Sequence, residues 1–419
     1  MKKLFALGTA ALLALGLASC GDEKTPVQTG GEAEGKTIEL EYSGTASNQE
    51  FNEELFEDFK EARAAAGDKN TYVITYVAHG PDKVDSEVLD WTTGPDVYEF
   101  ASDKITTLYQ KSALAKVGGQ YATFIEENNS DLGKDLATFN GDYYAYPYTG
   151  DNTYYLQYDK SKLTAEQAKS VEGILAAAEE QGLKFGYNLQ EAFWGAAALF
   201  TYGSDYSMVF DADGAVQSVT ANFDEANGIL AAKAIQKIVS SEAWSNTMEA
   251  PTEDNNFIGC IAGTWDIEAY REKLGDNYAC APMPTVTVDG QTKNLGAFLG
   301  GKLFGVNPQR AGTDVDRLVA AHELAKFLSG YECQVKRFDN QSVAPCNLEA
   351  AKLDRVVNNE NVQVLIEQAK FAHAQTAVPG NFWSAPATFV TSLVDGTVTD
   401  EASLLAALKT MNDSIKASK

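Results

Sequence analysis

Residues 72–101 read YVITYVAHGPDKVDSEVLDWTTGPDVYEFA, and this stretch decides the fold class. It opens with a run rich in β-branched and aromatic residues at 72–78 and closes with a second such run at 96–101. Both runs are typical of strands buried in a sheet. The segment between them predicts a short helix near 84–92. Two strands joined by a helix are expected to lie parallel in one sheet.

The residues before this stretch extend the same pattern. TIELEY at 37–42 alternates like a strand, and Phe51, Leu55 and Phe59 then recur at helical spacing. The order strand, helix, strand, helix, strand predicts an α/β fold, in which a parallel sheet carries helices on both faces. Ligands of such sheets bind just beyond the carboxyl ends of the strands.

The remainder of the chain continues to alternate. Strands are expected at three further places, 257–263, 278–281 and 298–306. Helices are expected at six, near 164–182, 189–200, 224–241, 314–329, 348–371 and 400–416. The DADG stretch at 211–214 resembles the start of a calcium loop, but Val216 and Asn222 stand where that loop needs Gly and Glu. A hairpin turn is the better interpretation.

The N-terminus indicates export. Lys2 and Lys3 precede an apolar run, and Leu-Ala-Ser leads directly into Cys20. A charged start, a short apolar segment and small residues at a cleavage site predict a signal peptide over residues 1–19. The pattern resembles the bacterial lipobox, in which the Cys is lipidated. Residues 20–36 would then form the lipidated Cys and a flexible linker, because they hold Gly, Pro, Thr and charges but no aromatic residue.

Composition excludes several kinds of partner. The 419 residues include 59 Asp and Glu against 33 Lys and Arg, giving a formal net charge of −26. Nucleic acid is a poor partner, because binding it needs a basic surface. The chain has three histidines, so a histidine-rich metal centre is not expected, and nothing in the sequence indicates a cofactor. No P-loop, dinucleotide-binding glycine pattern, GxSxG or HExxH motif occurs.

Four cysteines follow Cys20. Their even number in an exported chain permits two disulfides, with three possible pairings. The local pairs Cys260–Cys280 and Cys333–Cys346 are favoured. Zinc is a weaker alternative, since no CxxC pair supports it.

A set of short motifs in a common order resembles the extracellular solute-binding proteins of bacterial ABC importers, of the maltose/maltodextrin-binding type. The motifs are GPDK at 80–83, GPDV at 94–97, FASDK at 100–104, YP at 146–147, LQYDK at 156–160, NLQE at 188–191, GTW at 263–265, YACAPMP at 278–284, FDNQSVAP at 338–345 and PGNFW at 379–383.

The resemblance implies two lobes joined by a hinge, with a ligand cleft between them. Lobe 1 is expected over 37–147 plus 296–345, and lobe 2 over 150–295 plus 348–419. It further implies a non-catalytic protein, held outside the cell membrane by lipid. It would capture a soluble oligosaccharide and deliver it to the membrane permease.

The resemblance also implies ligand-binding residues. Aromatic plates for sugar rings would be Phe100, Phe193, Trp265 and Trp383, and polar partners would be Asp103, Lys104, Glu191 and, at the hinge, either Asp151 or Asn152. The chain departs from the family pattern in several places. Phe100 and Phe193 replace a Trp and a Tyr, Lys104 replaces an Arg, and an Asp-Lys pair expected near Gly44 is absent.

Other interpretations remain open from the sequence. Phe100 and Phe193 could be core residues, Glu191 could be a carboxylate in the first turn of a helix, favoured by the helix dipole, and Asp103 with Lys104 could be a surface pair. The solute could be another oligosaccharide or a peptide. A secreted glycosidase would need two carboxylates facing each other across the cleft. A structural or adhesive lipoprotein would bind no small molecule.

Overall fold

The computed structural model describes residues 35–211, 213–252 and 255–418. The expected signal peptide at 1–19, the lipidated Cys20 and the linker up to residue 34 lie outside the described residues.

The strands expected from the first hundred residues form a parallel sheet. β1 (Thr37–Gly44) lies between β2 (Thr71–Ala78) and β3 (Val97–Ala101) and is parallel to both. α1 (Gln49–Ala65) connects β1 to β2 and buries Leu55, Phe56 and Phe59. The predicted parallel arrangement is confirmed. The helix expected near 84–92 is shorter, since α2 covers only Val84–Glu87 and Val88 is already extended.

Two long strands connect this sheet with a second group of strands. β15 (Phe298–Val306) runs antiparallel to β3 on one side and to β6 (Tyr146–Asp159) on the other. β6 then pairs with β11 (Phe257–Gly263) and β12 (Tyr278–Ala281). With β10 (Trp244–Ser245) and β7 (Lys184–Gly186) added, the strand order is β10-β7-β11-β6-β15-β3-β1-β2, and β16 (His373–Ala374) pairs with β15.

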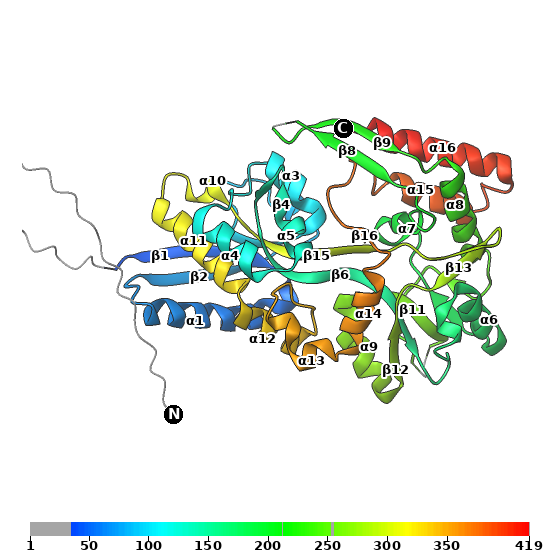
Figure 1. The fold of residues 1–419 in the computed structure, drawn as a ribbon, viewed down its shortest axis with the longest axis horizontal. Helices are drawn as coiled ribbons and strands as arrows, with labels where there is room; N and C mark the ends of the chain where they lie inside the picture. Colours follow the sequence, from blue (N-terminus) through cyan, green and yellow to red (C-terminus); the bar gives the residue numbers. More distant parts are fainter. Residues whose placement is uncertain (1–34, 212, 253–254, 419) are drawn as a thin grey trace, which may run out of the picture.

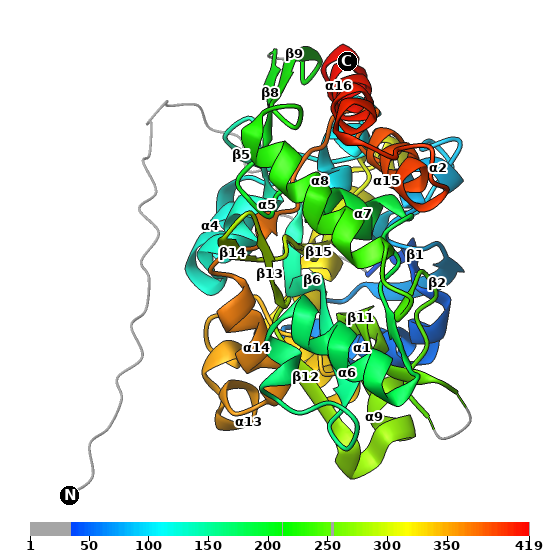
Figure 2. The same ribbon diagram turned by 90° about the vertical axis from the view of Figure 1, so that its right-hand side faces the viewer.

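The molecule has two lobes, each with its own hydrophobic core (Figure 1). In the first lobe, α1, α4 (Gly119–Asn128), α11 (Val315–Leu328) and α12 (Tyr331–Gln341) accompany β1, β2 and β3. The second lobe contains β7 (Lys184–Gly186), β10 (Trp244–Ser245), α6 (Val171–Gln181), α7 (Ala192–Ala198), α8 (Ala226–Val239), α15 (Ala385–Val394) and α16 (Glu401–Ala417). Figure 2 shows α6, α7 and α8 in front of β6 and β15. β6 and β15 run from one lobe into the other.

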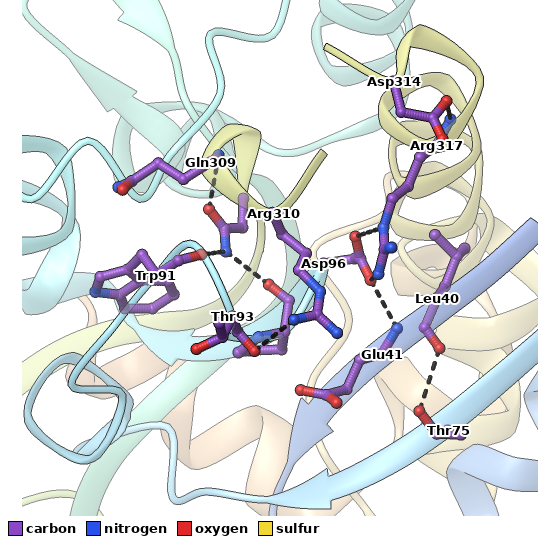
Figure 3. Close-up of polar contacts among 12 residues, drawn as sticks. Leu40, Glu41, Thr75, Trp91, Thr93, Asp96, Gln309, Arg310, Asp314 and Arg317 are labelled. Atoms are coloured by element: carbon purple, nitrogen blue, oxygen red, sulfur yellow. Dashed lines mark hydrogen bonds and ion pairs between the residues drawn. The ribbon is translucent and has the colours of Figure 1, made fainter. Parts of the chain in front are cut away.

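The first lobe is fastened by a buried ion pair between the sheet and α11 (Figure 3). Arg317 donates two hydrogen bonds to the Asp96 carboxylate, from Nε at 2.6 Å and from Nη2 at 2.7 Å. The same carboxylate accepts a hydrogen bond from the Glu41 backbone N–H at 2.8 Å. Asp96 is 1% exposed. This side chain, which directly precedes β3, therefore connects α11 with β1.

One expected helix is broken into three short pieces. The segment predicted as a helix over 348–371 forms a 3₁₀ turn at Ala350–Lys352, α13 (Asp354–Val357) and α14 (Glu360–Gln368). Asn359 starts α14 afresh, because its side chain accepts hydrogen bonds from the next two backbone N–H groups, a helix-capping role that ends the preceding turn.

The expected hairpin turn is confirmed by the described residues on either side of residue 212, because the Gly214 backbone N–H donates to the Asp211 carbonyl at 3.1 Å. It joins β8 (Tyr206–Phe210) to β9 (Val216–Ala221), which pair antiparallel. Gly214 has a φ of 79°, a left-handed conformation that glycine adopts without strain.

The predicted disulfide pairs Cys260–Cys280 and Cys333–Cys346 are wrong, because all four thiols are free. Cys260 on β11 and Cys280 on β12 both stand opposite Gln157, but on opposite sides of β6. Two strand spacings separate their Cα atoms by about 9–10 Å, beyond the reach of a disulfide. Cys333 packs into the first lobe's core.

Cys346 lies elsewhere, against Gly133 and Gly150. Burial raises the pKa of the Cys260 thiol to about 12, so it stays protonated at neutral pH.

Candidate functional site

A cavity of about 660 Å³ lies between the two lobes. Its lining comes from segments far apart in the chain: Thr45, Ser47, Gly80, Pro81, Asp82, Ala101, Asp103, Lys104, Asn152, Glu191, Phe193, Trp194, Trp265, Lys302, Gln375 and Trp383. Seven of the nine residues predicted to bind ligand are among them, namely Asp103, Lys104, Asn152, Glu191, Phe193, Trp265 and Trp383.

The polar side of the cavity is built from the carboxyl ends of parallel strands. Thr45 directly follows β1, Asp82 lies in the loop after β2, and Asp103 and Lys104 follow β3. Because these strands are parallel and adjacent, their ends meet at one edge of the sheet. This edge therefore presents hydroxyl, carboxylate and ammonium groups to the cavity.

The opposite side is aromatic. Phe193 and Trp194 lie on α7, Trp265 lies in the 3₁₀ turn that follows β11, and Trp383 precedes α15. The Phe193 ring centroid is 6.1 Å from that of Trp265 and 6.4 Å from that of Trp383. Trp265 is 48% exposed. The four rings form a continuous apolar surface.

Asp103 is a buried carboxylate. Its Oδ1 accepts a hydrogen bond from Gln375 Nε2 at 2.9 Å, and Lys104 Nζ lies 3.7 Å from its Oδ2. Burial raises the pKa of Asp103 to about 6, against the opposing effect of the Lys104 charge. At neutral pH it is an anionic hydrogen-bond acceptor.

Gln375 holds two of the polar groups in place. Its Nε2 donates to Asp103, and its Oε1 accepts from Asn152 Nδ2 at 2.7 Å. Asn152 comes from the long strand β6, and Asp103 from the end of β3. One amide therefore fixes the spacing between the hinge strand and the sheet edge.

Glu191 and Asp82 approach the cavity from opposite lobes. Glu191 caps α7, where its side chain accepts a hydrogen bond from the Phe193 backbone N–H at 3.2 Å. Partial burial, with the negative charge of Asp82 added, raises the pKa of Glu191. Glu191 therefore lines the cavity and stands one residue before the helix, as its N-cap, where the sequence alternative placed it in the first turn.

Two predicted site residues do not face the cavity. Phe100 is completely buried in a core cluster, where it packs against Tyr98, so the core interpretation of Phe100 is the correct one. Asp151 is 3% exposed, and its Oδ2 accepts a hydrogen bond from the Ala344 backbone N–H at 2.6 Å. Of the two hinge candidates, Asn152 lines the cavity. Neighbouring residues of a strand point to opposite faces, which separates the two.

Several lining residues were not predicted. Trp194 follows Phe193 and is a recognisable aromatic, but the α7 register that brings both rings to the cavity is not visible in the sequence. Gln375 directly follows β16, and Lys302 lies on β15. Both lie at the cavity because of the order in which the strands pair, which the sequence does not show. Thr45 and Ser47 occupy the place where the Asp-Lys pair was expected.

Within the described ranges, no group of three or more His, Cys, Asp or Glu residues is arranged to hold a metal ion. In the same part of the chain, no helix has the length and apolar character needed to cross a bilayer.

Two α/β lobes joined by long strands, with an aromatic and polar cavity between them, define a two-lobe binding protein. A family model described as bacterial extracellular solute-binding protein matches residues 54–364, and the chain belongs to this family.

The chain is also similar to individual relatives. It is 23% identical over 444 residues to the maltodextrin-binding protein MdxE of Bacillus subtilis (strain 168), covering 99% of this chain and 98% of that one. The structure of maltodextrin binding protein MalE1 from L. casei BL23 without ligand has a TM-score of 0.78 at 20% identity, over 92% of this chain and 100% of that one. A cyclo/maltodextrin-binding protein complexed with maltotetraose gives 0.69 at 19% identity, over 92% and 99%. The solved structures share the fold.

Proposed function

We propose that this protein is the lipid-anchored solute-binding component of an ABC importer and that it binds a maltodextrin-like α-glucan. The observation that carries the proposal is the pairing of one aromatic wall with one polar edge in a single interlobe cavity. The similarity to maltodextrin-binding proteins supports the choice of ligand.

The chemistry of the cavity suits a neutral sugar. A pyranose ring has apolar C–H faces, which pack on Trp265 and Trp383, and a rim of hydroxyl groups. Carboxylates such as Asp103 accept hydrogen bonds from hydroxyl groups, and lysine and amide N–H groups donate to them. Asp82, Asp103 and Glu191 together oppose the entry of an anionic solute.

Transport follows from lobe closure in this proposal. Lobe 1 comprises 37–147 plus 296–345, and lobe 2 comprises 150–295 plus 348–419. A ligand that touches both lobes favours the closed form by the free energy of its added contacts. The permease recognises the closed form. Cys20 carries the lipid, and the protein catalyses no reaction.

Thermal unfolding of the chain from residue 21 onward tests the proposal. It should be measured with and without millimolar maltose, maltotriose, a β-linked oligosaccharide, a pentose oligomer and a tripeptide. A ligand at 100 times its dissociation constant adds about 2.7 kcal/mol, which raises Tm by several degrees. We expect a shift with maltotriose and none with the tripeptide.

The other outcomes separate the alternatives. A shift only with a different solute would retain the transport role but reject the α-glucan. Release of shorter sugars during incubation with maltotriose would identify a glycosidase. No shift with any ligand would contradict a binding function.

A further inference from the structure

Lys302 is a lysine that lines the cavity. It lies on β15 and is partly buried. Among the residues that the structure describes, none forms a hydrogen bond or an ion pair with its Nζ. Lys104, the other lysine of the cavity, lies within 4 Å of carboxylates, 3.7 Å from Asp103 and 3.9 Å from Asp85. The two lysines therefore differ in how many of their N–H donors remain available to a ligand.

The backbone around Lys302 is irregular. In the pairing of β15 with β6, the register shifts between Gly300 and Lys302 and again between Lys302 and Leu303. Irregularities of this kind redirect a side chain and are common beside binding sites. The Lys302 backbone N–H donates to Thr149 Oγ1 at 3.2 Å, which fixes the strand at that point.

Asp151 is a carboxylate whose charge interacts with Lys302, and it already has another partner. Asp151 accepts a hydrogen bond from the Ala344 N–H at 2.6 Å and lies outside the cavity lining. The Lys302 charge lowers the pKa of Asp151, but burial outweighs it and the pKa remains raised. Among the described residues, no hydrogen bond or ion pair joins the Lys302 ammonium to Asp151, so its three N–H donors are not used there.

We propose that Lys302 is a ligand-binding and specificity-determining residue, whose ammonium group donates hydrogen bonds to hydroxyl oxygens of the bound α-glucan. This inference rests on the proposed function, because it deepens the description of the same site. A neutral polyol fits better than an anion, since Asp82, Asp103 and Glu191 line the same cavity.

The test compares binding of maltotriose by calorimetry in four proteins. Hydrogen bonds to a charged donor are strong, so Lys302→Met should weaken binding about 10- to 150-fold. Lys302→Arg keeps the charge and should weaken it less. Lys233→Met is the matched control, because Lys233 lies on α8 and pairs with Asp289 outside the cavity, and its affinity should match that of the unmodified protein.

A set of monodeoxy maltotrioses separates direct contact from a structural effect. Removing the hydroxyl that Lys302 binds should weaken binding to the unmodified protein but not to Lys302→Met. Unchanged affinity of Lys302→Met, or equal losses with every deoxy sugar in both proteins, would overturn the assignment. Should Lys302→Met unfold early in a thermal scan, Lys302→Gln replaces it.

The two proposals fail in different ways. If the unmodified protein binds no maltotriose, the proposed function is wrong and this inference falls with it. If the unmodified protein binds maltotriose and Lys302→Met binds it equally well, only the role of Lys302 is wrong.

Discussion

Asp103 is a buried carboxylate, so the pH dependence of stability should reveal its shifted pKa. Its pKa of about 6 lies above the ordinary value because burial disfavours the charged form. Between pH 4 and pH 6 the folded protein therefore holds a proton at Asp103 that the unfolded chain has released. By linkage, the stability contribution of this residue increases as the pH falls from 7 through 6 towards 4.

Replacing Asp103 with Asn removes this titration while keeping an acceptor for Gln375. We expect the difference in unfolding free energy, native minus Asp103→Asn, to shift in favour of the native protein by about 2 kcal/mol between pH 7 and pH 4.5. Urea unfolding at both pH values measures it. A difference that does not change with pH would mean that Asp103 is not desolvated.

Trp265, which is exposed, and Trp383, which is half-buried, are the residues on which sugar affinity should depend. Trp265→Ala and Trp383→Ala should each weaken maltotriose binding at least about tenfold, as expected for aromatic anchors at the centre of a binding surface. Trp265 is 48% exposed, so its loss should change the Tm of the free protein little. Trp244→Phe serves as the control, because Trp244 lies on β10 and does not line the cavity. An unchanged affinity in both alanine variants would show that the sugar binds at another place on the protein.

At the scale of single elements, the sequence predicted what a local pattern encodes. β1, β2, β3 and their parallel order follow from apolar runs, and β15 begins and ends as expected. β6 was missed because Pro147 and Gly150 interrupt a run that tertiary pairing keeps extended on both sides. Phe100 was misplaced because every residue of β3 is buried, so the sequence does not show which face meets the cavity.

Strand pairing also decides the state of the cysteines. Because Cys260 and Cys280 flank β6, the reducing agent dithiothreitol should leave Tm unchanged. Thiol titration of the unfolded chain from residue 21 onward should give four free thiols. A loss of several degrees on reduction would contradict the strand register. The control is the same scan after alkylation of the unfolded, reduced protein.

The link between α11 and the sheet is a stability prediction at the same scale. Asp96→Ala removes both hydrogen bonds to Arg317 and the one from Glu41, and should cost about 2–3 kcal/mol in urea unfolding. Asp413→Ala breaks an exposed pair with Lys409 and should cost less than about 0.5 kcal/mol. Equal costs for the two variants would show that burial of Asp96 is unimportant.

At the scale of the whole molecule, the site exists only because distant segments meet. Thr45, Asp103, Glu191, Lys302 and Trp383 belong to segments that no local pattern connects. Sequence motifs identified seven of the lining residues through family resemblance. Gln375 and Lys302 could not be found in that way, because their roles depend on strand order and on which neighbouring groups are already paired.

Titration calorimetry of maltotriose into the chain from residue 21 onward shows whether this protein binds an α-glucan. We expect saturable binding at one site per chain. We also expect a negative heat-capacity change, because the aromatic wall loses contact with water when the sugar packs on it. Absence of any saturable heat up to millimolar maltotriose, at two temperatures and with a folded protein, would contradict it.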